Sequence, residues 1–192
     1  PTDSNGDFAW LQHMVKSMNL KSGRCAVVLP QGVLFRGGKE GEIRRQLVES
    51  DKLEAIITLA SGVFYSTGVS ACILFLNNDK IASHRERICM IDASGIYTPQ
   101  RAQNIMTEDN IQTVFDYYKA YVDVIEKVKI VTIADIRAKD YSLAINNYID
   151  KKEQEMIPPE EVRRKYFEAY TEMAEAEARM RELLLKGGYI SE

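Results

Sequence analysis

The sequence predicts an α/β fold, and three short apolar segments with one helical segment between the first two carry that prediction. The apolar segments are Cys25–Leu29, Leu53–Leu59 and Ser70–Leu76, and the helical segment is Glu40–Ser50. Each apolar run is almost continuous in Val, Ile, Leu, Ala and Cys, which is typical of strands buried on both faces of a sheet. We therefore expect three core strands that are covered on both sides.

The chain before the first strand is predicted to be a linker followed by a helix. Residues 1–6 are polar and rich in turn formers, so we expect a disordered or linking segment. A helix begins at Asp7, whose carboxylate is suited to cap it. Its apolar face consists of Phe8, Leu11, Met14, Val15 and Met18.

A glycine-rich loop follows the first strand, which ends at Pro30. Within this loop, Arg36-Gly37-Gly38-Lys39 precedes a helix, an arrangement that can bind a phosphate through backbone amides and the helix dipole. A flexible loop that only needs glycine explains the same residues equally well. On the helix we expect Ile43, Leu47 and Val48 to point inward and Arg44, Arg45 and Glu49 to point outward.

The rest of the core is predicted from shorter signals. Ile88–Ile91 is a further strand, Val128–Ile133 is a candidate strand, and short helical turns follow as far as Ile149. A helix begins near Thr107, with acidic residues favouring its first turn. Its predicted apolar stripe consists of Ile111, Phe115, Tyr118, Val122 and Ile125.

The C-terminal segment, residues 158–188, reads as one long helix for binding a partner. Pro158-Pro159 marks its start and Gly187-Gly188 its end. Apolar residues recur in alternating steps of four and three along an otherwise charged helix, as in a coiled coil. They are Val162, Tyr166, Ala169, Met173, Ala176, Met180 and Leu183. The alternative is that this helix folds back on its own domain.

Composition sets limits on the class of protein. The chain has 192 residues, 45% hydrophobic content and a net charge of -3, which fits one globular domain with an appendage or two small domains. Its 3 Cys and 2 His have no metal-ligand spacing, and we find no catalytic, cofactor-binding or metal motif in the residues themselves. The odd number of Cys predicts a reducing, cytoplasmic location, and no apolar run has membrane length.

Three stretches of the chain resemble the modification subunit of type I restriction–modification systems. They are DFAWLQHM, GRCAVVLPQGVLFRGGKEGEIRRQLVESDKLEAIITL and GVFYSTGVSACILFLNN. A weaker likeness continues through RICMIDAS and VTIADIRAKDYSLAINNYI, so the resemblance covers Asp7–Ile149. The occurrence of LPQGVLFRGG followed by GVFYSTGVSACILFL is a specific combination.

The resemblance implies an adenine-N6 DNA methyltransferase that uses S-adenosylmethionine, with a Rossmann-like sheet in which one strand runs antiparallel between its neighbours. In that family a glycine-rich cofactor motif and an Asn-Pro-Pro-Phe/Tyr catalytic motif precede the DFAWLQHM helix, and neither occurs in this sequence. We therefore expect residues 7–150 to be the C-terminal half of the methyltransferase domain with its extension. The complete subunit would be the enzyme and this chain alone inactive. The alternative is a non-catalytic scaffold or interaction module derived from a methyltransferase.

Site residues are carried over from the family on the matching motifs. Phe64, or less favourably Tyr65, falls in the loop whose aromatic residue contacts the flipped adenine; the alternative is that Phe64 fills the core beneath the loop. Arg36 and Lys39 are candidates for contact with DNA phosphates, and the alternative is a solvated helix face that pairs with Glu40 and Glu42. Arg44 and Arg45 are better explained as a solvated helix face.

The resemblance also implies partners. These are DNA, a specificity subunit that docks on the C-terminal helix, and a restriction subunit in the full complex. The DNA target sequence is read by the specificity subunit and is not encoded here. Because the first half of the sheet is absent, one edge of the Cys25–Leu29 strand would be uncovered, which predicts self-association of this chain.

Overall fold

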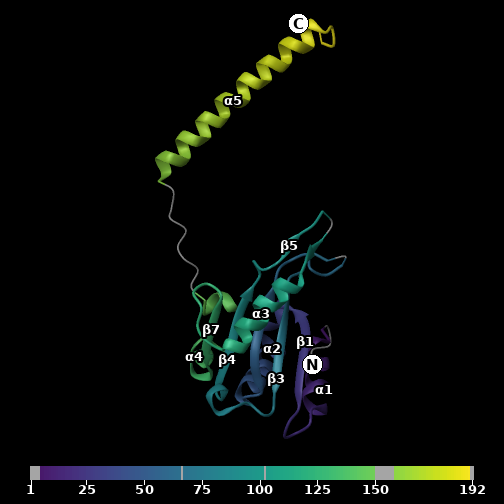
Figure 1. The fold of residues 1–192 in the computed structure, drawn as a ribbon, viewed down its shortest axis with the longest axis vertical. Coiled ribbons are helices and arrows are strands. Elements are labelled where there is room, and N and C mark those ends of the chain that lie inside the picture. The colour runs from purple at the N-terminus through teal and green to yellow at the C-terminus, as the bar shows by residue number, and fades with distance from the viewer. Residues whose placement is uncertain (1–4, 66, 102, 150–157, 191–192) are drawn as a thin grey trace. The chain divides into compact units, whose positions relative to one another are not determined.

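The computed structural model describes residues 5–65, 67–101, 103–149 and 158–190, and the chain divides into two compact units (Figure 1). Unit 1 is Pro1–Lys151 and unit 2 is Lys152–Glu192. Most of the predicted linker at residues 1–6 lies outside the described residues. None of the helices in the described part of the chain combines the length and apolar character that crossing a membrane requires.

Unit 1 is built on a five-stranded mixed sheet with the order β1-β3-β2-β4-β7. β3 runs antiparallel between β1 and β2, β2 and β4 are parallel, and β7 is antiparallel to β4. The carboxyl ends of β1, β2 and β4 therefore lie at the same edge of the sheet. The strands are β1 (Arg24–Pro30), β2 (Leu53–Leu59), β3 (Ala71–Asn77), β4 (Arg87–Ala93) and β7 (Val128–Thr132).

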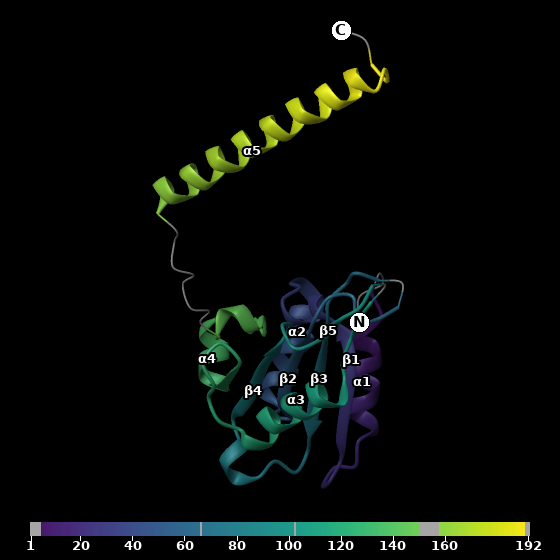
Figure 2. The ribbon, with the colours of Figure 1, turned by 45° about the horizontal axis from the view of Figure 1, so that its top comes forward.

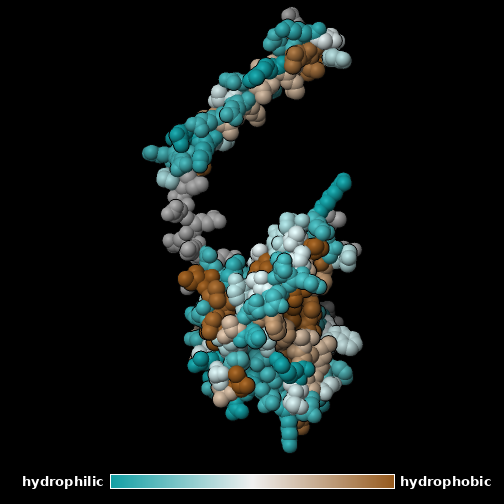
Figure 3. Space-filling model, in the orientation of Figure 1, coloured by the Kyte–Doolittle hydropathy of each residue, from teal (hydrophilic) through white to brown (hydrophobic). Residues whose placement is uncertain are grey.

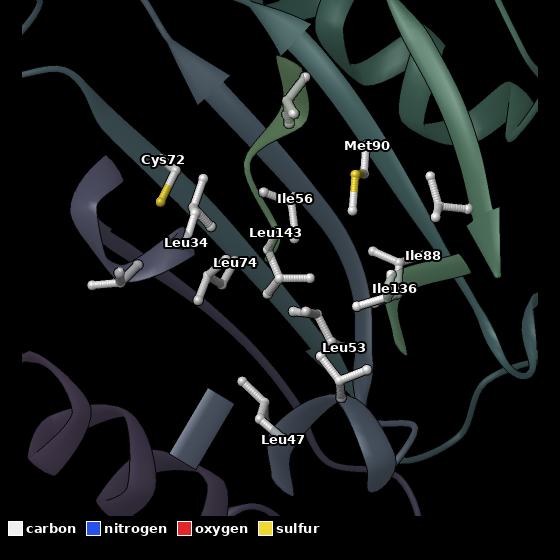
Figure 4. Packing of buried hydrophobic residues seen from close by; sticks show 14 of the residues in the cluster. Leu34, Leu47, Leu53, Ile56, Cys72, Leu74, Ile88, Met90, Ile136 and Leu143 are labelled. Atoms are coloured by element: carbon white, nitrogen blue, oxygen red, sulfur yellow. The ribbon is translucent and has the colours of Figure 1, made fainter. Parts of the chain in front are cut away.

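Helices cover the first face of this sheet along its whole width. Figure 4 shows part of the packing, in which Leu47, Ile136 and Leu143 meet apolar side chains of β2, β3 and β4. The helical elements of this layer are α1 (Asp7–Ser17), α2 (Gly38–Glu49), α4 (Ile133–Ala138), and 3-10 turns at Gln31–Leu34 and Ile145–Asn147. This layer confirms the inward faces predicted for the first two helices.

The second face is covered by one helix, α3 (Glu108–Ala120), which Figure 2 shows lying across the sheet. Its core includes Ile57, Ile91 and Val114. A small hairpin precedes α3, formed by β5 (Thr98–Pro99) and β6 (Asn104–Ile105), and a 3-10 turn at Ala82–His84 precedes β4. Because α3 is the one helix that the described residues place on this face, the cover decreases toward β1.

The prediction that all three core strands are buried on both faces is wrong for β1. β2 is buried at every position, but burial alternates along β1. Val27 and Leu29 face the core, whereas Ala26 is exposed and Val28 is 50% exposed. The reason is position: β1 is an edge strand, and within the described residues no helix packs on its second face.

Two expectations for the helices on the first face need correction. Asp7 does not cap α1, whose N-cap is Gly6; its carboxylate instead forms an ion pair with Arg36 at 3.0 Å. Arg44 does not point outward but is buried, with 4% of its surface exposed. Its guanidinium donates to the carbonyls of Val33 (3.2 Å), Arg36 (2.7 Å) and Tyr141 (2.8 Å), so it joins three segments of the fold.

The apolar stripe predicted for the helix near Thr107 is also wrong in most positions. Ile111 and Phe115 are more than half exposed, and the helix ends at Ala120, before the last two residues of that stripe. The face that packs on the sheet contains Val114 and Tyr117 instead, and Tyr118 is the one position of the stripe that is correct. Beneath this face lies Glu54, a buried carboxylate of β2. It accepts a hydrogen bond of 2.8 Å from the hydroxyl of Tyr118, a group that aliphatic side chains lack. Burial raises the pKa of Glu54, but hydrogen bonds from Tyr118, Asn77 and His84 outweigh it and lower the pKa overall.

Unit 2 contains the helix α5 (Pro159–Lys186), which follows the predicted boundaries. Charged pairs one turn apart line it, such as Lys165 with Glu161 at 2.9 Å and Lys186 with Glu182 at 2.7 Å. Seam residues including Met173 are more than half exposed. Figure 3 shows hydrophobic patches, in brown, on a mostly hydrophilic helix.

Candidate functional site

The candidate site is the set of loops at the carboxyl edge of the sheet. The loop after β1 leads into α2, the loop after β2 contains the predicted aromatic residues, and the segment after β4 contains the β5–β6 hairpin. Loops at the carboxyl ends of strands are where α/β sheets bind their ligands. Both ribbon views show the hairpin beside the loop that follows β2 (Figures 1 and 2).

Both predicted aromatic residues are exposed at this edge. Phe64 is 39% exposed and Tyr65 is 86% exposed. Neither belongs to either apolar core cluster of unit 1, so Phe64 does not fill the core beneath the loop. An exposed aromatic ring on a loop is available for stacking against a planar ligand.

The loop after β2, residues 60–70, is held at both of its ends. Near its start, Asn104 donates its backbone N–H to the carbonyl of Gly62 (2.9 Å) and its side-chain amide to the carbonyl of Ser61 (2.8 Å). Gln103 donates its side-chain amide to the carbonyl of Val63 (2.6 Å). Near its end, the carbonyl of Ser70 accepts a hydrogen bond of 3.1 Å from the N–H of Gln31.

Sequence reasoning did not single out Gln103 or Asn104. They lie in a segment that reads only as a loop, and no local pattern indicates that their amides reach a loop some forty positions earlier. The nearest signal is Gly62, which adopts φ +69°, a conformation that other residues rarely adopt. That glycine indicates a fixed turn but not the partner that fixes it.

The two predicted phosphate-contacting residues differ in their surroundings. The guanidinium of Arg36 donates to Asp7 at 3.0 Å and to Glu40 at 3.5 Å. The hydrogen bond with Asp7, supported by the charge of Glu40, raises the pKa of Arg36 above its usual value. Lys39 lies on the first turn of α2, is exposed, and within the described residues forms no ion pair. Arg45, for comparison, pairs with Glu42 at 2.9 Å, as a solvated helix face predicts.

The buried thiols of unit 1 and the arrangement of its possible metal ligands limit the chemistry that the described residues can perform. Burial raises the pKa of both Cys72 and Cys89 to about 12, so neither thiol is a nucleophile near neutral pH. Among the described residues no group of three His, Cys, Asp or Glu side chains is placed to hold a metal ion.

The residues present do not fit a nucleotide-like cofactor such as S-adenosylmethionine. Asp92, the acidic residue near the carboxyl end of β4, accepts hydrogen bonds from Thr58 (3.2 Å) and from the N–H of Ser94 (3.0 Å). It therefore shapes its own turn and is not presented to a ligand. The sequence also contains no glycine-rich cofactor motif, so we derive no step through a cofactor on this chain.

Comparison with known proteins was made for both sequence and structure. The family model described as N-6 DNA Methylase matches residues 1–156. The type I restriction enzyme MjaVIII methylase subunit of Methanocaldococcus jannaschii is 34% identical over 158 residues, which are 81% of this chain and 27% of that protein. The type I restriction enzyme HindI methylase subunit of Haemophilus influenzae is 32% identical over 163 residues, which are 81% of this chain and 36% of that protein. This chain spans well under half the length of these relatives.

Solved structures give the same result. The methyltransferase subunit of a type I restriction-modification system from Streptococcus thermophilus matches with a TM-score of 0.74 and 32% identity, covering 78% of this chain and 31% of that one. The M protein of the type I restriction enzyme EcoKI matches with a TM-score of 0.58 over 94% of this chain and 44% of that one. At 21% identity the second match supports the fold alone.

Proposed function

The chain belongs to the N-6 DNA methylase family, with the methylase subunits of type I restriction–modification systems, and on that premise we propose that it forms the base-receiving half of an adenine-N6 DNA methyltransferase. In this proposal the sheet is the second half of a Rossmann-like methyltransferase sheet. A separate segment supplies the glycine-rich and Asn-Pro-Pro-Phe/Tyr motifs and holds S-adenosylmethionine. This chain supplies a wall against which the target adenine rests.

The observation that carries the proposal is the exposed ring of Phe64 at the carboxyl edge of the sheet. An enzyme that modifies a base in duplex DNA must take it out of the stack and hold it, usually against aromatic side chains. Stacking of a base on an aromatic ring contributes roughly 1–3 kcal/mol. A presented ring is all that this role requires, and Tyr65 beside it is the second candidate.

The uncovered side of β1 supports docking of the other half. No strand pairs with the outer edge of β1 within the described residues, and the side chain of Val28 on its second face is half exposed. An apolar edge strand pairs readily with another strand. In the absence of its counterpart, the same edge is expected to cause self-association of this chain.

Lys39 is the stronger of the two candidates for a DNA phosphate contact. Its ammonium group is exposed, whereas Arg36 would have to share its bonds with Asp7 and Glu40. Neutralising Lys39 in the complete enzyme should weaken DNA binding at every sequence and reduce the salt dependence of binding by about one phosphate contact. An unchanged salt dependence would exclude that contact.

The experiment that tests the proposal compares this chain alone with the complete methylase subunit bound to its specificity subunit. With labelled S-adenosylmethionine and target duplexes, we expect no methyl transfer by this chain alone. In the complete enzyme, Phe64→Ala should weaken binding of the target base by roughly 5- to 100-fold. Val69→Ala, at another exposed apolar position of the same loop, is the matched control. Unchanged binding and turnover in Phe64→Ala would overturn the proposed role.

We further propose that α5 binds the specificity subunit. Its seam is exposed within unit 2, and such a helix gains most of its stability from a partner. Replacing Met173 and Met180 with Lys should abolish copurification with the specificity subunit, whereas Glu175→Lys, on the side of the helix away from the seam, should not. Retained complex formation after both seam substitutions would contradict this assignment.

A further inference from the structure

We propose that the β5–β6 hairpin, through Gln103 and Asn104, positions the loop that presents Phe64 to the target base. The inference rests on the proposed function, because the positioning matters only if the ring receives a base. It assigns two positioning residues that touch neither base nor cofactor. They act by fixing the backbone from which the aromatic ring projects.

The contacts converge on three consecutive carbonyl groups. Ser61, Gly62 and Val63 each have their carbonyl oxygen bonded by the hairpin, at 2.8 Å, 2.9 Å and 2.6 Å. Phe64 is the next residue along the chain. All three donors come from two adjacent residues, so the backbone preceding the ring is fixed from one side by one element.

The turn at Gly62 has a backbone conformation that favours glycine over other residues. Gly62 adopts φ +69°, and a Cβ at that position would lie 3.6 Å from the side-chain nitrogen of Asn104. The positive φ, rather than crowding, is what requires glycine there. Because Gly62 has no side chain, the side chain of Asn104 can lie against the backbone there, and its amide donates to the carbonyl of Ser61.

The hairpin is itself bonded to the N-terminal end of α3. Its own turn is closed by the hydrogen bond of 3.2 Å from the N–H of Gln100 to the carbonyl of Gln103. The hydroxyl of Thr98 donates to the side-chain oxygen of Asn110 at 3.2 Å. Asn110 in turn forms the capping box of α3 with Thr107. A continuous set of hydrogen bonds thus runs from the start of α3 to the residue before Phe64.

This arrangement preorganises the ring. A loop attached only at its ends samples many conformations, and ordering it when the base arrives costs free energy. A loop whose backbone is already bonded avoids most of that cost, and even a displacement of about 1 Å at a reacting centre lowers rates substantially. Loss of the hairpin contacts should therefore slow methyl transfer without changing the affinity for S-adenosylmethionine.

The test uses isosteric substitutions in the complete methylase subunit assembled with its specificity subunit. Asn104→Asp and Gln103→Glu each replace the donating amide nitrogen with a carboxylate oxygen that faces a carbonyl. Gln100→Glu makes the same change on an exposed hairpin residue whose side chain has no hydrogen bond to the loop among the described residues. The measurements are single-turnover methyl transfer, the KM for S-adenosylmethionine, the fluorescence of 2-aminopurine placed at the target position, and the thermal unfolding midpoint.

We expect Asn104→Asp and Gln103→Glu to lower the single-turnover rate and the 2-aminopurine signal by roughly tenfold. The KM for S-adenosylmethionine and the rate of Gln100→Glu should stay unchanged. Combined with Phe64→Ala, neither substitution should cause further loss, because all three act through the same ring.

Two results separate the two proposals. If Phe64→Ala impairs base binding but Asn104→Asp and Gln103→Glu behave like Gln100→Glu, the positioning role is wrong and the proposed function stands. If Phe64→Ala has no effect, the proposed function is wrong, and a loss in the hairpin variants then contradicts action through the ring.

Discussion

The two edges of the sheet in unit 1 are built differently. At β7 the outer edge is blocked: Asp123 accepts a hydrogen bond of 2.8 Å from the N–H of Ile130 and pairs with Lys129 at 2.6 Å. At β1 the edge carries Ala26 and Val28, both exposed, and within the described residues no strand or side-chain carboxylate covers it. Proteins usually protect an edge strand with charge or a covering segment. The β7 edge has that protection and the β1 edge lacks it.

This difference indicates at which edge the sheet ends and at which edge a further strand can pair. β7 has the exposed Lys129 near its middle, whereas Val128 and Val131 are buried on opposite faces of the sheet. β1 is apolar on both faces, the pattern of an interior strand, yet in the part of the chain that the structure describes it pairs with β3 alone. Its sequence therefore fits a strand that is interior in a larger sheet.

The largest effect that tests this comparison is on stability. Val131→Ala should lower the free energy of unfolding of this chain by about 2 kcal/mol, because that side chain is 3% exposed. Val28→Ala, the matched change on the other edge strand, should alter it by no more than about 0.5 kcal/mol. Urea unfolding of both variants measures the difference. Equal losses would mean that β1 is already covered in the free chain.

An intermediate effect is expected at the blocked edge. Asp123→Asn should cost about 0.5–1 kcal/mol, since an exposed ion pair contributes little and the backbone hydrogen bond supplies most of the loss. Partial burial raises the pKa of Asp123, but the bonds from Lys129 and Ile130 and the charge of Lys129 lower it overall.

The pH dependence follows from that lowered pKa. The stabilisation is fully present above the unfolded value of about 3.9 and is lost as the pH falls through the lower pKa of the folded state. Unfolding measured from pH 6 to pH 2 should show this contribution in the parent chain and not in Asp123→Asn. Parallel pH profiles for the two would show that the carboxylate does not protect the edge.

The smallest effect on stability is expected when a charge is placed on the open edge strand, β1. The same substitution is the most direct test of whether that strand is open. Val28→Lys should leave the unfolding free energy within about 0.5 kcal/mol, because the side chain is half exposed. It should also weaken self-association seen by sedimentation velocity at increasing concentration. Val69→Lys, on an exposed loop, is the control. Undiminished association of Val28→Lys would place the contact elsewhere.

The sequence predicted the bounds of the strands and helices better than it predicted which of their side chains are buried. The three core strands and the helix between the first two lie within a residue or two of the predicted bounds, because apolar runs and turn residues are local signals. The inward position of Arg44 was missed, since only the fold brings the carbonyls of Val33 and Tyr141 to its guanidinium. The α3 stripe was also wrong in most positions, because the face that packs on the sheet contains Val114 and Tyr117 and the helix ends at Ala120.

Some residues of the candidate site could be predicted from the sequence, and others could be found only from the fold. Phe64 was chosen from the resemblance and Lys39 from the glycine-rich loop before a helix. The fold places both on exposed segments, but the roles themselves remain predictions. Gln103 and Asn104 have no sequence signal, because their partners lie far away along the chain.

The sequence by itself determined the α/β class, the family and the order of the elements, because these depend on local periodicity and on motifs that survive in one dimension. Only the tertiary structure decided which strand is an open edge, which arginine is buried and which hairpin holds the aromatic loop. Those properties depend on contacts between distant segments, and the hydrophobicity of a residue does not specify which groups the fold brings next to it.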